Sequence, residues 1–117
     1  MGSLALAVTF ALSFISERDG NREVYLVQSD GSSERRLSHS GDADYNGPTT
    51  PDGHDLLVTS VSESDRRKLQ RFFLYPLGGG TPRPLGPPRS VLRSPSFSRD
   101  GKFLFFGASY GFPVLQG

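Results

Sequence analysis

The first group of residues that could support chemistry is a candidate nucleophile near the end of the chain. Gly107-Ala108-Ser109-Tyr110-Gly111 matches the G-x-S-x-G pattern of a nucleophile elbow and follows an apolar run. In hydrolases with this motif, a helix, an acid and a histidine follow the serine along the chain. Only eight residues follow Ser109, none of them acidic or a histidine, and both His39 and His54 precede it. We therefore expect a strand end with a glycine turn, and no catalytic residues.

A second group resembles the opening of a calcium-binding loop. Asp42, Asp44 and Asn46 occupy the first, third and fifth positions of an EF-hand pattern. The twelfth position, which needs a bidentate Glu, is Gly53, and Pro48 occupies the position that supplies a backbone carbonyl. The pattern favours a loop between two repeats in which these side chains cap turns. We predict no metal or cofactor, and calcium binding through Asp42, Asp44 and Asn46 remains the alternative.

A run of charged residues and two histidines complete the inventory. Asp65-Arg66-Arg67-Lys68 could contact phosphate or an acidic partner, but Glu63 and Asp65 offset its positive charge. A solvated loop is the favoured interpretation, and residues 62–70 and 41–46 are where a partner contact would be sought first. His39 and His54 are isolated in the sequence and are expected in surface or turn positions.

The elements that would position these residues repeat along the chain with a period of 48 residues. Val24-Tyr25-Leu26-Val27 before Asp30-Gly31 corresponds to Phe72-Phe73-Leu74-Tyr75 before Gly78-Gly79. The same shift places Asp52-Gly53 on Asp100-Gly101. Short apolar runs and glycine turns at this spacing are typical of β-propeller blades, each of which needs neighbours to cover its two faces.

Turn residues between short apolar runs predict strands throughout and almost no helix. The expected strands are residues 11–16, 23–28, 34–38, 45–50, 56–60, 71–77, 81–85, 94–98 and 103–106. They predict one full four-stranded antiparallel blade at 44–86, with blade fragments at 4–40 and 92–117. An inserted loop of about four extra residues at 61–70 interrupts the period, and Gly86-Pro87-Pro88 is expected to separate two blades. The predicted fold is therefore all-β, an incomplete, open β-propeller.

Composition fits this fold and excludes some functions. With 14 Gly, 9 Pro and a hydrophobic content of 35%, the 117-residue chain suits a turn-rich β protein better than a helical bundle. A net charge of +1 predicts no steering toward nucleic acid, and the absence of cysteine excludes a disulfide framework. The apolar run 4–15 is too short to span a bilayer and lacks a basic start, so we expect a buried strand there more than a signal peptide.

Two segments resemble the repeats of TolB-type propellers, a WD40-like beta propeller repeat family. One segment begins at Phe14 and contains Arg18-Asp19-Gly20-Asn21 and Val24-Tyr25, which resemble the repeat's "S-x-R-D-G-N" and "I/V-Y" elements. It ends at Arg35-Arg36-Leu37-Ser38, which resembles the element "R-x-L-T". Pro95-Ser96-Phe97-Ser98-Arg99-Asp100-Gly101-Lys102 resembles "P-x-W-S-P-D-G-K", with Phe97 for Trp and Arg99 for Pro.

The resemblance implies a non-catalytic scaffold for protein–protein interaction, in the periplasm or envelope of a bacterium. Its implied partners are envelope proteins, further blades of a longer chain, or a second copy, with no nucleic acid and no membrane span. The alternative is a fragment of the propeller domain of a prolyl-oligopeptidase-like serine peptidase. Propellers serve many activities, so the fold alone does not decide between these functions.

Overall fold

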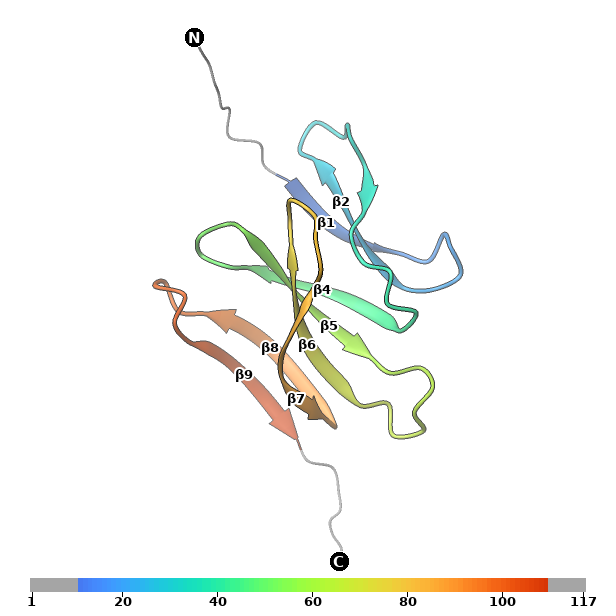
Figure 1. The fold of residues 1–117 in the computed structure, drawn as a ribbon, viewed down its shortest axis with the longest axis vertical. Coiled ribbons are helices and arrows are strands. Elements are labelled where there is room, and N and C mark those ends of the chain that lie inside the picture. The colour runs from blue at the N-terminus through green and yellow to red at the C-terminus, as the bar shows by residue number, and fades with distance from the viewer. Residues whose placement is uncertain (1–10, 110–117) are drawn as a thin grey trace, which may run out of the picture.

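Residues 11–109 are described by the structure, a computed structural model, and they form three antiparallel sheets without a helix (Figure 1). The strands pair in the order β1-β2-β3, β4-β5-β6-β7 and β8-β9. The predicted all-β fold with a four-stranded antiparallel sheet is therefore confirmed. The strands are β1 Ala11–Ser16, β2 Glu23–Gln28, β3 Arg35–Arg36, β4 Ala43–Thr49, β5 Asp55–Val61, β6 Gln70–Pro76, β7 Arg83–Arg89, β8 Val91–Phe97 and β9 Leu104–Ser109.

The two Asp-Gly turns that the 48-residue period relates have the same hydrogen bonds and connect the first two strands of their sheets. The turn between β4 and β5 places Asp52 Oδ1 to accept hydrogen bonds from Thr50 Oγ1 at 2.7 Å and from the backbone N of His54 at 3.0 Å. The turn between β8 and β9 repeats this around Asp100, with Ser98 and Lys102 as the donors. Asp-Gly sequences form such turns because the aspartate caps the backbone and glycine tolerates a positive φ.

The middle sheet, β4–β7, has a buried core on each of its two faces. On one face, Leu56, Val58 and Tyr75 pack against Val24 and Leu26 of β2 and against Leu37, which directly follows β3. On the other face, Leu57, Phe72 and Leu74 pack against Leu92 of the β8–β9 sheet. Successive side chains of a strand point to opposite faces, so the apolar run of β5 supplies both cores. Figure 1 shows the β4–β7 sheet between the other two.

The structure corrects the prediction that Gly86-Pro87-Pro88 separates two blades, because these residues lie within β7. The register between β6 and β7 shifts there, and Arg71 Nε donates a hydrogen bond to the carbonyl oxygen of Gly86 at 2.9 Å. Proline lacks a donor and is therefore confined to edge strands and bulges, and β7 provides both. From sequence alone, Gly-Pro-Pro indicates the end of a strand, whereas an edge strand such as β7 can include it.

Other boundaries differ from the sequence expectation or lie outside the described residues: the strands expected at 81–85 and 94–98, for example, are Arg83–Arg89 and Val91–Phe97. The third strand, expected over 34–38, is limited to Arg35–Arg36. Residues 4–10 of the first predicted blade fragment, with most of the apolar run 4–15, lie outside the described part, as do residues 110–117 of the third fragment.

The irregular pairing of β4 with β5 predicts a cost for a small substitution. The register shifts between Asn46 and Thr49, and a Cβ added at Gly47 would lie 3.0 Å from the backbone oxygen of Leu57. Gly47→Ala should therefore lower the free energy of unfolding by about 1–3 kcal/mol, through overpacking. Urea denaturation measures the change. Gly78→Ala is the control, because no atom lies within 4 Å of its added Cβ. Equal stabilities of the two variants would contradict this account of the bulge.

Candidate functional site

Two carboxyl groups meet, fully buried, where the β1–β3 sheet contacts the middle sheet. Glu23 opens β2 and Asp44 lies in β4, and both are 0% exposed. The backbone N of Asp44 donates a hydrogen bond to the carbonyl oxygen of Arg22 at 2.8 Å, which brings the two strands together. Carboxylates are rarely buried without partners, because removing the charge from water is costly.

The partners of the pair come from three segments. Ser38 Oγ donates to Glu23 Oε1 at 2.8 Å, and an Arg36 guanidinium nitrogen lies 3.1 Å from Glu23 Oε2. Ser40 Oγ contacts both oxygens of Asp44, at 2.9 and 2.8 Å, and Ser60 Oγ donates to Asp44 Oδ1. The network therefore connects β2, β4 and β5 with the segment after β3.

The environment separates the pKa values of the two acids. Burial, the largest effect, and the hydrogen bond with Glu23 together raise the pKa of Asp44 from 3.8 to about 6, against the hydroxyls of Ser60 and Ser40, which lower it. Burial also opposes ionisation of Glu23, but Asp44, Ser38 and the charge of Arg36 outweigh it and lower the pKa of Glu23. Below about pH 6 the proton of the pair therefore resides on Asp44 and not on Glu23.

The predicted turn-capping loop at Asp42, Asp44 and Asn46 is not what the structure has. Asp44 and Asn46 lie in the extended strand β4, and Asn46 Nδ2 donates to Ser13 Oγ at 2.7 Å in the neighbouring sheet. Asp42 Oδ1 instead accepts a hydrogen bond from the backbone N of Glu63 at 3.3 Å. The three side chains therefore face different partners. Within residues 11–109, no group of three or more His, Cys, Asp or Glu side chains could hold a metal ion.

The other candidate residues from the sequence are spread over the molecule. Ser109 ends β9, where its backbone pairs with Val91, while Tyr110 and Gly111 of its motif lie outside the described residues. His54 is exposed in the β4–β5 turn, with Nδ1 3.3 Å from Asp52. His39 follows β3 and lines a pocket beside the acid pair. The structure does not bring the two histidines together.

The charged run lies in the loop between β5 and β6, as the sequence predicts. The backbone N of Ser62 donates to the carbonyl oxygen of Leu69 at 2.9 Å and closes this loop. Lys68 Nζ lies 3.3 Å from Glu63, and the backbone N of Arg67 donates to Asp65 at 2.9 Å. The acids of the loop therefore offset part of its positive charge locally.

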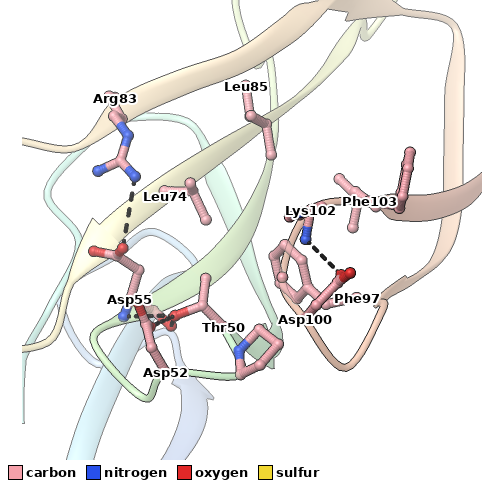
Figure 2. Close-up of a pocket in the computed structure, with 13 residues that line it drawn as sticks. Thr50, Asp52, Asp55, Leu74, Arg83, Leu85, Phe97, Asp100, Lys102 and Phe103 are labelled. Carbon is pink, nitrogen blue, oxygen red and sulfur yellow. Dashed lines mark hydrogen bonds and ion pairs between the residues drawn. The ribbon is translucent and has the colours of Figure 1, made fainter.

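A pocket of about 300 Å³ lies between the two Asp-Gly turns, with the side chains of β6 and β7 on its far wall (Figure 2). Its apolar wall includes Leu74 and Leu85, and Phe97 faces them from β8. The pocket's acidic groups already have partners within it. Arg83 lies 3.6 Å from Asp55, and the backbone N of Lys102 donates to Asp100 at 3.0 Å. Each of these contacts lies within one sheet or one turn, so the acids of the pocket are already partly neutralised or hydrogen-bonded.

An uncovered aromatic surface lies on the outer face of the β8–β9 sheet. Phe103, just before β9, is 63% exposed, and Phe105 within β9 is 60% exposed, with their ring centroids 6.5 Å apart. The next residue, Phe106, points to the opposite face, where its ring meets Phe72 edge-on with a centroid separation of 5.3 Å. We call Phe103 and Phe105 the aromatic pair.

The outermost face of the β1–β3 sheet is only partly apolar. Leu12 is 57% exposed there, while Phe14 stacks on Tyr25 with ring centroids 5.6 Å apart. The Arg18 guanidinium lies over the Tyr25 ring at 4.4 Å and covers much of it. The two end faces of the molecule therefore differ, and the aromatic pair is the more apolar surface.

Comparisons with protein-family models and with curated protein sequences find no match for this chain. No helix of residues 11–109 is long and apolar enough to cross a membrane.

Sequence reasoning missed Glu23, Ser38 and Ser60 as members of one network. A possible signal was the charge of Glu23 directly before the apolar run of β2, since an acid that begins a buried strand needs a partner. The identity of that partner depends on how two sheets pack, which the local pattern does not specify.

The raised pKa of Asp44 predicts a pH dependence of stability. Between about pH 4 and 6, Asp44 keeps its proton when folded and loses it when unfolded, so its contribution to stability falls as pH rises and is constant above that range. The unfolding free energy of the wild type relative to Asp44→Asn should fall by about 2 kcal/mol from pH 4 to 7. Urea denaturation at a series of pH values measures this difference.

Asp30→Asn is the matched control, since Asp30 is exposed in the β2–β3 turn and hydrogen-bonded only within it. The difference in unfolding free energy between Asp30→Asn and the wild type should not change between pH 5 and 7. If the difference in unfolding free energy between the wild type and Asp44→Asn did not change with pH, the raised pKa of Asp44 would be contradicted.

Proposed function

We propose that this chain is a non-catalytic protein-interaction module, an open array of propeller-type blades. The aromatic pair on the outer face of the β8–β9 sheet is the observation that supports this function most directly. Two phenylalanines that are both more than half exposed on one sheet face are unfavourable in water. Exposed apolar patches of this kind mark sites where another protein binds.

The stacking of the sheets supports the propeller part of the proposal. Each face of the middle sheet is covered by a neighbouring sheet, and corresponding turns of the repeat occupy corresponding places. Within residues 11–109, the β8–β9 sheet has such a neighbour on one face only, so a further sheet would be the natural occupant of its outer face. The resemblance to TolB-type repeats supports a scaffold role at a bacterial envelope.

The β-sheet that binds the aromatic pair would come from a further blade or from a partner protein. Sheets that pack face to face lie about 10 Å apart and interdigitate their side chains. A partner with an apolar sheet face would bury both rings, and each phenylalanine buried in this way contributes about 2 kcal/mol or more. The interaction therefore depends on apolar surface, which agrees with the chain's near-zero net charge.

A double variant tests this surface. Phe103→Ser with Phe105→Ser should abolish association while leaving the fold intact, because both side chains point away from the core. Sedimentation velocity over a range of concentrations measures self-association, since a second copy offers apolar sheet faces of its own. A photo-crosslinking amino acid at position 103 reports contacts with other proteins, and its adducts are identified by mass spectrometry.

The control places the crosslinker at Ser32, an exposed position in the β2–β3 turn. A monomer at every concentration, together with no specific adduct from position 103, would refute the proposed surface. Hydrolysis of ester substrates by the purified chain, abolished in Ser109→Ala, would refute the non-catalytic part and favour a hydrolase.

A further inference from the structure

A second pocket, of about 400 Å³, lies where the segment after β3 faces β6, and it is separate from the aromatic pair. Its floor contains the aromatic rings of Phe73 and Tyr75, and its walls include Asp42, His39 and Ser40. Ser40 and Ser60 line the pocket and also donate hydrogen bonds to the buried Asp44. The pocket therefore lies directly beside the acid pair. A volume of this size is in the usual range for small-molecule sites.

Tyr75 gives this pocket a polar group without a partner. The residue is only 6% exposed, yet its hydroxyl makes no hydrogen bond within the described residues 11–109. By contrast, the other tyrosine of comparable burial, Tyr25, donates its hydroxyl proton to Asp19 at 2.6 Å. Among the described residues, only Gln28 Oε1 is a fully buried side-chain polar atom without a partner, so the Tyr75 hydroxyl still reaches solvent. An unpaired hydroxyl that opens to a pocket is available to an incoming polar group.

The electrostatic potential at this hydroxyl is negative. Burial raises the pKa of Tyr75 to about 12, and the negative charges of Asp44, Glu23 and Asp42 raise it in the same direction. The same negative charges that disfavour the ionised, phenolate form of Tyr75 would repel an anion at this hydroxyl and attract a cation. The pocket thus selects for positive charge.

The aromatic floor is suited to the same kind of ligand. The ring of Phe73 already has the guanidinium of Arg71 5.8 Å from its centroid, on the side of a neighbouring pocket. Cations are attracted to the faces of aromatic rings, and the apolar part of a ligand gains by covering Phe73. Arg71 lowers the negative potential to some extent, but it does not line the pocket beside the acid pair.

We propose that this pocket binds a primary ammonium ion with a small apolar body. The ammonium group donates hydrogen bonds to the hydroxyl of Tyr75 and to the carboxylate of Asp42, while the apolar body lies against Phe73. The buried acid pair adds a net negative charge behind Ser40 and Ser60.

Benzylammonium is the probe that tests this site. Titration of the full chain, followed by two-dimensional amide NMR at about pH 7.5, where an ordinary histidine is neutral, should give saturable shifts at residues 39–42 and 73–82. Benzyl alcohol and benzoate have the same ring without the positive charge, and they should give much smaller shifts at these residues. Equal responses to all three compounds, or no saturable response to benzylammonium, would overturn the proposal.

Two variants locate the bound ammonium group. Asp42→Asn removes the charge but keeps an oxygen that can accept the hydrogen bond from Glu63, and it should weaken binding about fivefold or more. Tyr75→Phe keeps the buried ring and removes only the hydroxyl, and it should weaken binding about threefold. Asp30→Asn makes the same charge change in a distant turn and should leave the affinity unchanged. Unchanged affinity in both pocket variants, each with a wild-type amide spectrum elsewhere, would refute this site.

Discussion

A sheet with apolar side chains on both faces must be covered on both faces, and the middle sheet of this protein is built in that way. Leu57 and Val58 are adjacent in β5, both fully buried, and they belong to different cores. Water cannot be excluded from both side chains by one neighbouring sheet. The arrangement of the other two sheets follows from this requirement.

The buried acid pair determines how two of these sheets meet. An apolar seam alone would tolerate small shifts between the sheets, whereas Glu23 and Asp44 must stay within reach of their hydroxyl and guanidinium partners. A lost partner would leave a charge buried without compensation, which is strongly destabilising. The same negative charge extends to the pocket at Tyr75, so the network that sets the packing also lies beside the proposed ammonium site.

Local features of the fold were predictable from the sequence, and contacts between sheets were not. The turns at Asp52 and Asp100 and the strand at 23–28 follow from short-range rules, because turn chemistry and alternation act within a few residues. Gly86-Pro87-Pro88 was misassigned because its tolerance depends on the edge position of β7. Asp44 was predicted only to cap a turn or to bind calcium, and its partnership with Glu23, 21 positions earlier in the sequence, depends on how two sheets pack.

A double-mutant cycle tests the two-sided packing of the middle sheet most directly. Leu92→Ala is combined with Leu57→Ala, which shares its core, and separately with Val58→Ala, which faces the opposite core. Unfolding free energies should show a coupling of about 0.5–3 kcal/mol for Leu57 with Leu92, and additive effects for Val58 with Leu92. Additivity in both cycles, or stronger coupling of Leu92 to Val58, would contradict the stacked arrangement of the three sheets.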